Sequence, residues 1–369
     1  MAAIPLWLAD EDDWVLVQTD VDDDFLTLLR HCNIPIPQFI KLDVLLRQQP
    51  ALHRFLPWGW SLATHQYFKQ VKALCDTQFQ SLPVASWKSD HKQLFGRMTA
   101  LRLSEKLALL VESHPLIRMP KSTLVISNRR QAEDVIANFG GQLVFKAPWS
   151  SSGRGLMMVN VDEQRRPDFR WIEATIRQQG YIMAEPFLKR IHDLSFHFFI
   201  HEDGEIEYLG HNFFLTNDKG KFNGCVLEPM PSNAFDSPDC DRLMQAIADA
   251  PELIGYALQQ LNIHTHYSGP IGVDAMWYLH ADGNCYLQPV IETNVRFTMG
   301  LLNIYLRRKL HPQACGQWYI NQFEPNEFER FCADQMKQFP LQLEIGKLKR
   351  GFLPMVPFKG VWGAWLLLK

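Results

Sequence analysis

Two Asp-Gly dipeptides, each between runs of strand-forming residues, place the strongest constraint on how this chain can fold. They are Asp203-Gly204 and Asp282-Gly283, and the flanking runs are residues 196–200, 206–209, 275–279 and 285–290. Asp-Gly supplies the positive φ angles of a tight turn, so each pair of runs is predicted to form an antiparallel hairpin. Shorter apolar runs predict further strands at 142–146, 156–159 and 181–184. Helical patterns cover 162–179, 240–262 and 318–337, so the body is predicted to be α+β, with helices covering strand pairs.

The first part of the chain has a different pattern, which predicts a small α/β domain. Residues 14–18 are typical of a buried strand, and the acidic run Asp22 to Asp24 suits a helix N-terminus, where negative charge meets the positive end of the helix dipole. A helix over 101–112, with Ser104 as its N-cap, is predicted to begin the next unit.

Composition excludes several classes of protein. The chain has 369 residues, 47% of them hydrophobic, which indicates a folded protein with more than one core. Its net charge of −3 does not suit a polyanion binder, and no apolar stretch approaches the roughly 18 residues of a membrane span. The first residues lack the basic start of a signal peptide, so we expect a cytoplasmic protein. The seven cysteines are scattered without a CxxC pair, which predicts reduced, mostly buried thiols.

Lys146 leaves a predicted strand and enters a loop rich in serine and glycine, which ends at Gly155. Such a loop can offer successive backbone N–H groups to phosphate oxygens, because glycine lets the backbone approach closely. The lysine precedes the glycines, so the loop matches neither of the common nucleotide-binding loops. On these residues alone, an ordinary hairpin loop is the alternative.

Asp274, Glu292, Asn294 and Arg296 come from the two strands of the second hairpin. Glu292, Asn294 and Arg296 are spaced by two residues, so their side chains share one face of the sheet with Asp274. Two carboxylates and an amide oxygen suit Mg²⁺, and Arg296 adds a cation beside them. Pro289 lies inside the second strand, which requires a bulge or an edge position. The alternative is an exposed strand with a surface ion pair.

Six segments follow one another in the order of a known superfamily. They are LSEK at 103–106, LVFKAP at 143–148, SSSGRG at 150–155, MAEPFL at 183–188 with DLS at 193–195, GVD at 272–274 and IETNVR at 291–296. In this order and spacing the chain resembles the ATP-grasp superfamily, in particular carboxylate–amine ligases such as D-alanine:D-alanine ligase and biotin carboxylase. The resemblance covers about residues 98–303. It implies an ATP-grasp domain over 98–303, with subdomains at about 98–184 and 185–303. An α/β domain over 1–97 would precede it, and a helical segment and tail over 304–369 would pack on it.

The resemblance also implies a role for individual residues. Lys106 and Lys146 would contact the α- and β-phosphates of ATP. The glycine loop would close over the β/γ end through Ser151, Ser152, Gly153 and Gly155. Glu185, with the backbone of Phe187 and Leu188, would bind adenine, and Asp193 would bind the ribose. The base would lie between Met276 and Ile291. One or two Mg²⁺ ions (Mn²⁺ being possible) would be held by Asp274, Glu292 and Asn294. The groups beside the transferred phosphoryl and the second substrate would be Arg296, Arg154 and Lys221.

The chemistry implied is that of an ADP-forming ligase. A carboxylate would be activated as an acyl phosphate and attacked by an amine, a thiol or another nucleophile. The expected partners are small-molecule or peptide carboxylates and amines, without nucleic acid or membrane, and an oligomer is possible. Two alternatives stay open, a nucleotide-binding regulatory module without catalysis and an ATP-grasp kinase. A turn with two tryptophans at 57–60 either lines the substrate cleft or belongs to a core.

Overall fold

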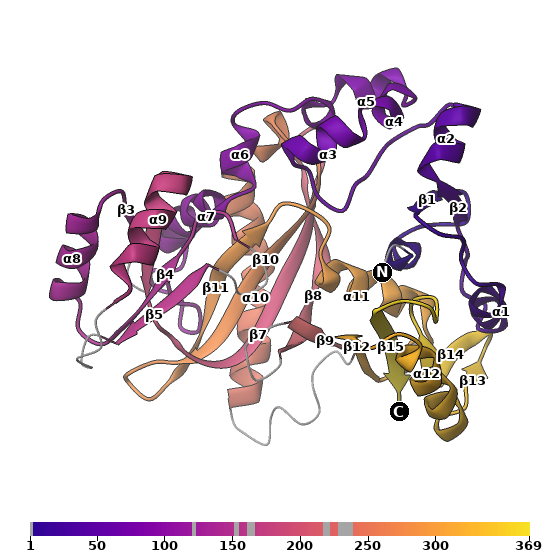
Figure 1. Cartoon of the computed structure of the whole chain (residues 1–369). Helices are drawn as coiled ribbons and strands as arrows, with labels where there is room; N and C mark the ends of the chain where they lie inside the picture. The colour runs from indigo at the N-terminus through magenta and orange to yellow at the C-terminus, as the bar shows by residue number, and fades with distance from the viewer. Residues whose placement is uncertain (1–2, 120–122, 151–154, 161–166, 217–221, 228–238) are drawn as a thin grey trace.

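The computed structural model describes residues 3–119, 123–150, 155–160, 167–216, 222–227 and 239–369 of the chain (Figure 1). The strands of these residues form three sheets, of two, four and nine strands. None of the helices in the described ranges is both long enough and apolar enough to cross a membrane. Five of the seven cysteines are buried, as predicted.

The N-terminal part of the chain contains the two-stranded sheet and mostly short helices. β1 (Trp14–Val17) and β2 (Gln38–Lys41) pair in parallel, and α1 (Asp23–His31) connects them. The predicted strand and the acidic helix start are confirmed, since Asp23 and Asp24 occupy the first turn of α1. The short helices are η1 (Ile4–Trp7), α2 (Leu42–Gln48), α3 (Leu62–Tyr67), α4 (Lys69–Ala73), α5 (Thr77–Ser81), η2 (Pro83–Ala85) and α6 (His91–Leu94).

The four-stranded sheet is antiparallel and has its own core. Its order is β3-β6-β4-β5, and its strands are β3 (Leu124–Ile126), β4 (Gln142–Lys146), β5 (Leu156–Asn160) and β6 (Ile182–Pro186). α8 (Arg129–Asn138) and α9 (Phe169–Gln179) pack on it, so that Ala132 and Ile172 join Phe145 in one apolar cluster (Figure 1). Lys146 is thereby fixed at the end of a central strand.

The nine-stranded sheet contains both predicted hairpins. Its order is β11-β10-β7-β8-β9-β12-β15-β14-β13. The strands from the first half of this sheet are β7 (Lys189–Ile200), β8 (Ile206–Thr216), β9 (Phe222–Val226), β10 (Gly269–Leu279) and β11 (Cys285–Asn294). β7 pairs with β8 and β10 with β11, both antiparallel, as the Asp-Gly turns predict. α10 (Asp239–Gln260) contributes Ile247 and Ile254 to a core that also contains Phe196 and Val273 from the sheet.

Pro289 is accommodated as expected for a proline within a strand. β11 is the edge strand of the sheet, and its register with β10 jumps from Asp274↔Glu292 to Met276↔Gln288. Two residues of β10 therefore correspond to four of β11. Because proline has no N–H to donate, it is tolerated at such an irregular edge position.

α7 begins earlier than predicted, which corrects the expected helix start. It spans Arg97–Leu110 with Gly96 as N-cap, so Ser104 lies inside the helix and does not cap it. The apolar stripe that buries Leu103 and Leu107 extends back to Ala100, which explains the longer helix.

The C-terminal region is rich in strands, which corrects the helical segment expected over 304–369. It contains the end of α11 (Met299–Lys309), then β12 (Gly316–Gln322), α12 (Glu327–Gln338), β13 (Gln342–Glu344), β14 (Lys347–Pro354) and β15 (Trp362–Leu368). The predicted helix over 318–337 is wrong in its first part, because Trp318 and its neighbours alternate between buried and less buried positions in β12. The N-terminus completes this core, where Trp7 Nε1 donates to the Met355 carbonyl at 2.8 Å.

Candidate active site

Lys146 and Glu185 form an ion pair on neighbouring strands of the four-stranded sheet. The Lys146 Nζ contacts Glu185 Oε2, and Thr123 Oγ1 donates to the other carboxylate oxygen at 3.2 Å. Lys146 is only 8% exposed, so its charge is held in place by Glu185 and not by water. β4 and β6 therefore present a fixed cation and a carboxylate where the serine- and glycine-rich loop begins.

Arg97, which is not among the site residues predicted from the sequence, joins this region to the nine-stranded sheet. Its Nη1 lies 3.1 Å from Glu292 Oε2, its Nε donates to the Ala147 carbonyl at 3.1 Å, and its Nη2 donates to Ser150 Oγ at 3.3 Å. The guanidinium is buried. A basic residue at the first position of a helix opposes the helix dipole, and this is the sequence signal that could have singled out Arg97.

Asp274, Glu292 and Asn294 lie together, as predicted. Asp274 is directly opposite Glu292 in the β10–β11 register, and Asn294 is two residues further along β11. The Asn294 Nδ2 donates to Asp274 Oδ2 at 2.9 Å. Arg296 Nη2 in turn donates to Asn294 Oδ1 at 2.8 Å, so the exposed Arg296 is held beside the acidic pair.

The electrostatics of this pair suit a cation. Burial and the neighbouring Glu292 carboxylate raise the pKa of Asp274 to about 7. A divalent ion between the two carboxylates would relieve both effects, and carboxylate and amide oxygens are the ligands that Mg²⁺ prefers. In the described parts of the chain no three His, Cys, Asp or Glu side chains are grouped for a metal, so two carboxylates and an amide form the set that fits.

The residues predicted to bind the nucleoside are close to the acidic pair in the sheet. Asp193 on β7 is the register partner of Met276 on β10, two residues from Asp274. Arg190 Nη1 donates to Asp193 Oδ2 at 2.7 Å, while burial raises the pKa of the Asp193 carboxyl. Met276 and Ile291 are both half-buried, so each has surface left for a ligand.

A buried polar cluster supports the same face of the sheet. His197 Nε2 lies 2.9 Å from both Ser195 Oγ and Asn212 Oδ1, and Ser195 is the register partner of Asp274. All three side chains are almost fully buried, and burial lowers the pKa of His197 to about 4. The ring is therefore neutral at neutral pH. Gly300 of α11 packs directly on this cluster.

Other predicted residues have different positions. Lys106 is exposed in the third turn of α7, so it does not open the helix as expected. The Phe187 N–H donates to the Gln142 carbonyl at 2.8 Å, which leaves the Phe187 carbonyl and Leu188 for the expected backbone contacts with a ligand. Gly155 has a φ of +71° and accepts from the Ala147 N–H at 2.8 Å. Ser151, Ser152, Gly153, Arg154 and Lys221 lie outside the described residues.

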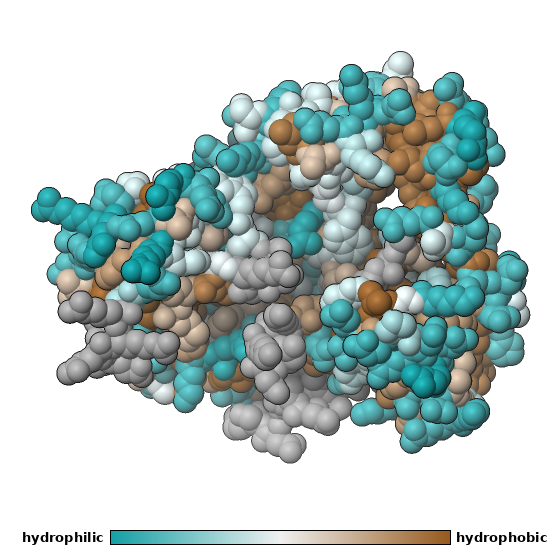
Figure 2. All heavy atoms as spheres, viewed as in Figure 1, coloured by the Kyte–Doolittle hydropathy of each residue, from teal (hydrophilic) through white to brown (hydrophobic). Residues whose placement is uncertain are grey.

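The first half of the turn with two tryptophans, at residues 57–60, borders the site. The Phe297 N–H donates to the Trp58 carbonyl at 3.0 Å, and a Cβ on Gly59 would lie 3.4 Å from the Arg296 side chain. Trp60 packs instead on Phe55, with ring centroids 5.9 Å apart. Figure 2 shows the surrounding face hollowed near its centre, between the α8–α9 side and the C-terminal strands.

Comparison with solved structures identifies the fold. The biotin carboxylase domain of 2-oxoglutarate carboxylase from Hydrogenobacter thermophilus, in complex with MgADP, ADP and bicarbonate, is 12% identical and superposes with a TM-score of 0.53, over 100% of this chain and 84% of the other. Carboxyaminoimidazole ribonucleotide synthase from Aspergillus clavatus, complexed with ATP, is 12% identical with a TM-score of 0.51, over 98% of this chain and 94% of the other. The chain has the ATP-grasp fold. No family model matches the sequence, and no curated protein matches it.

The charged residues above come from two sheets. Lys146 and Glu185 belong to the four-stranded sheet, while Asp193, Asp274 and Glu292 belong to the nine-stranded sheet. Arg97 of α7 contacts both regions, through the Ala147 carbonyl, which follows β4, and through Glu292 of β11.

Proposed function

We propose that this chain is an ATP-dependent, Mg²⁺-requiring ligase that activates a carboxylate as an acyl phosphate. The observation that carries the proposal is the Arg97–Glu292 ion pair, which joins the lysine-bearing strand to the acidic hairpin in one continuous charged site. A protein that only binds a nucleotide has no need of buried cations beside the reacting phosphates. The likeness in fold to an ATP-bound synthase and an ADP-bound carboxylase supports the same proposal.

The residues divide into groups that bind ATP and groups that act on the phosphoryl group. Glu185, the Phe187 carbonyl and Leu188 bind adenine, Asp193 binds the ribose, and Met276 and Ile291 enclose the base. Lys146 and Arg97 contact the phosphates. Arg97 takes the place that the sequence analysis gave to Lys106, because Arg97 is buried beside Glu292 and Lys106 is exposed on the helix surface.

Asp274, Glu292 and Asn294 would hold Mg²⁺, which, when bound, neutralises charge on the phosphates. Arg296, which donates to Asn294 Oδ1, would stabilise the phosphoryl group in transfer. A carboxylate oxygen attacks the γ-phosphorus, ADP leaves, and an acyl phosphate forms. A nucleophile then attacks the carbonyl carbon and releases phosphate.

The experiment is a measurement of ADP and phosphate release with Mg²⁺, ATP and a panel of carboxylates. Bicarbonate belongs in the panel because the Hydrogenobacter structure contains it, together with amino acids, dipeptides and small dicarboxylates. A ligase gives ADP, phosphate and a condensed product in equal amounts. A kinase gives ADP and a phosphorylated acceptor and releases no free phosphate. If the protein binds ATP tightly but releases no ADP with any carboxylate of the panel, the ligase proposal is wrong and a regulatory nucleotide-binding role replaces it.

A further inference from the structure

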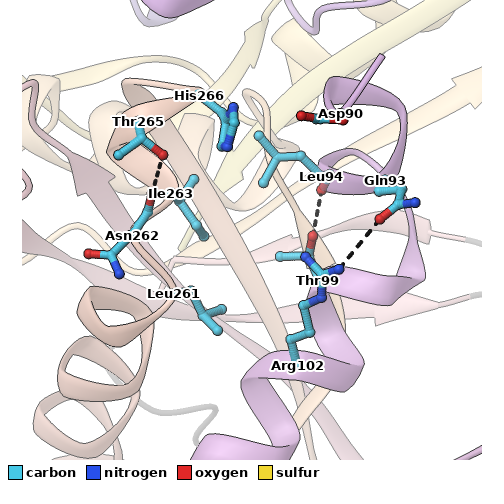
Figure 3. Close-up of a pocket in the computed structure, with 10 residues that line it drawn as sticks. All are labelled: Asp90, Gln93, Leu94, Thr99, Arg102, Leu261, Asn262, Ile263, Thr265 and His266. Carbon is cyan, nitrogen blue, oxygen red and sulfur yellow. Dashed lines mark hydrogen bonds between the residues drawn. The ribbon is translucent and has the colours of Figure 1, made fainter. Parts of the chain in front are cut away.

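A second cavity lies away from the charged site, where α6 and α7 face the loop between α10 and β10. It has a volume of about 420 Å³ (Figure 3). One wall consists of residues from α6 and α7, and the other consists of residues from the end of α10 and from η3 (Ile263–Thr265). The lining residues are Asp90, Gln93, Leu94, Thr99, Arg102, Leu261, Asn262, Ile263, Thr265 and His266. None of them belongs to the candidate active site.

The charged groups of this cavity are not paired with each other. Figure 3 shows Asp90 near the top of the view and the Arg102 side chain below it, with its guanidinium end beside Thr99 and Gln93. Among the described residues the Arg102 side chain makes one hydrogen bond, in which its Nη2 donates to Gln93 Oε1 at 3.4 Å, and no carboxylate there forms an ion pair with it. The Asp90 carboxylate accepts, from this part of the chain, only from the adjacent Ser89 hydroxyl, at 3.3 Å. Both charges therefore have hydrogen-bonding capacity left for a ligand.

A third polar group in the cavity is buried and has no partner. The Nδ1 of His266 is shielded from solvent and lacks a hydrogen bond to any described residue. In Figure 3 the His266 ring lies at the same end as Asp90, next to Leu94. Buried polar atoms are nearly always hydrogen-bonded in native proteins, so an orphaned nitrogen in a cavity indicates a missing partner. A ligand with a polar end near Asp90 would supply it.

Apolar side chains line the space between the two charged ends. Leu94 extends from one wall, and Leu261 and Ile263 extend from the other. Such a lining favours a short hydrocarbon chain between the polar ends of a ligand. The volume also falls within the usual range for small-molecule sites, which begins at about 300 Å³.

We propose that this cavity binds a small aliphatic zwitterion, with its carboxylate on Arg102 and its ammonium on Asp90. Arg102 offers the planar donor fork that suits a carboxylate, and Asp90 with His266 offers acceptors for an ammonium. ω-Amino acids, whose ammonium and carboxylate lie at the two ends of a hydrocarbon chain, belong to this chemical class. The site is separate from the proposed ligase site and does not depend on that function.

Binding is tested on the full-length protein without ATP. Isothermal titration calorimetry uses 4-aminobutanoate, 5-aminopentanoate and 6-aminohexanoate as probes, at up to 10 mM, which is roughly the weak end of small-ligand affinity. We expect at least one probe to bind, and pentanoate and pentylamine, which each carry only one of the two charges, to bind at least about tenfold more weakly.

Two variants and one control connect the binding to this cavity. Arg102→Gln and Asp90→Asn should each lower the affinity for the best-binding probe by about tenfold or more. Thermal melting should show that both variants are folded. Glu292→Gln, which alters the other site, should bind the probe as the wild type does. Absence of binding for all three probes overturns the proposal. It is equally overturned by binding that both cavity variants leave unchanged or that Glu292→Gln abolishes, because the probe would then occupy another place.

Discussion

The Arg97 guanidinium joins the start of α7 to the nine-stranded sheet through the Glu292 carboxylate, with Nη1 3.1 Å from Oε2. One residue begins α7 and the other lies near the end of β11, 195 positions later in the chain. Because the contact is buried on the Arg97 side, removing either partner leaves a charge without its counterion.

Arg97→Gln is expected to reduce ATP affinity at least about tenfold, since it removes a cation beside the proposed phosphate position. Nucleotide titration by fluorescence or calorimetry measures the change. Arg177→Gln, at an exposed position on α9, is the matched control and should bind ATP normally. Lys106→Gln tests the original sequence prediction. Loss of affinity in Lys106→Gln but not in Arg97→Gln would restore Lys106 as the phosphate ligand.

Glu292→Gln should retain much of the ATP affinity and lose turnover, because the proposed metal ligand acts mainly during phosphoryl transfer. Lys146→Ala should instead weaken ATP binding. The two variants are compared by nucleotide titration and by ADP release under the same conditions. Equal and complete loss of binding in both variants would show that the binding and metal roles are assigned to the wrong residues.

Arg296→Ala should lower turnover by about a hundredfold, with only a modest change in ATP affinity, if its contacts strengthen in the transition state. Steady-state kinetics with an accepted substrate separates the two effects. Arg296→Lys, which keeps the charge, should recover part of the rate. A purely structural role of Arg296 against Gly59 predicts the same loss in the lysine and alanine variants, together with a lower melting temperature.

Gly300→Ala is expected to destabilise the fold by about 1–3 kcal/mol. An added Cβ would lie 2.4 Å from both His197 Nε2 and Asn212 Oδ1. The matched control is Gly255→Ala in α10, where the nearest atom to an added Cβ is 3.8 Å away. That variant should be neutral or more stable by up to about 1 kcal/mol, as usual for glycine in a helix. Urea unfolding compares the two, and equal stabilities would contradict the close packing of α11 on the cluster.

The buried His197 should make stability fall as the pH is lowered. The unfolded chain takes up a proton near the ordinary pKa of 6.5, whereas folded His197 stays neutral down to about pH 4. Its contribution is therefore complete above pH 6.5 and lost progressively below it, on the order of 3 kcal/mol in total. Asp274, whose pKa is raised, acts in the opposite direction in the same window. The urea midpoints of the wild type and of His197→Gln are therefore compared at pH 7 and pH 5, and the wild type should lose more stability between the two pH values. An equal loss of stability in the two proteins would contradict the prediction.

The elements governed by local chemistry could be predicted from the sequence. The two Asp-Gly turns fixed both hairpins and, through strand periodicity, placed Asp274 opposite Glu292. The irregular register around Pro289 followed from the missing N–H of proline.

The elements decided by tertiary contacts could not be predicted. Ser104 is a good N-cap by type, yet Ala100 faces the core and extends α7 back to Arg97. The aromatic residues from Trp318 onward fit either a helix or a strand, and pairing with β9 and β15 decides between them. Arg97 meets Glu292 only in the folded chain, so no local pattern could connect the two.

The hydrogen bond between Trp7 and Met355 has a consequence for the order in which the molecule is made. The two residues are separated by 348 positions, so at about 5–20 residues per second the ribosome needs roughly 20–70 seconds between them. Until β14 has emerged, the core that the apolar side chains of η1 enter lacks Phe352 and Leu353. Chaperones bind apolar surface that an incomplete core leaves exposed. Slowing translation of the last strands would lengthen the period in which it can be captured or degraded.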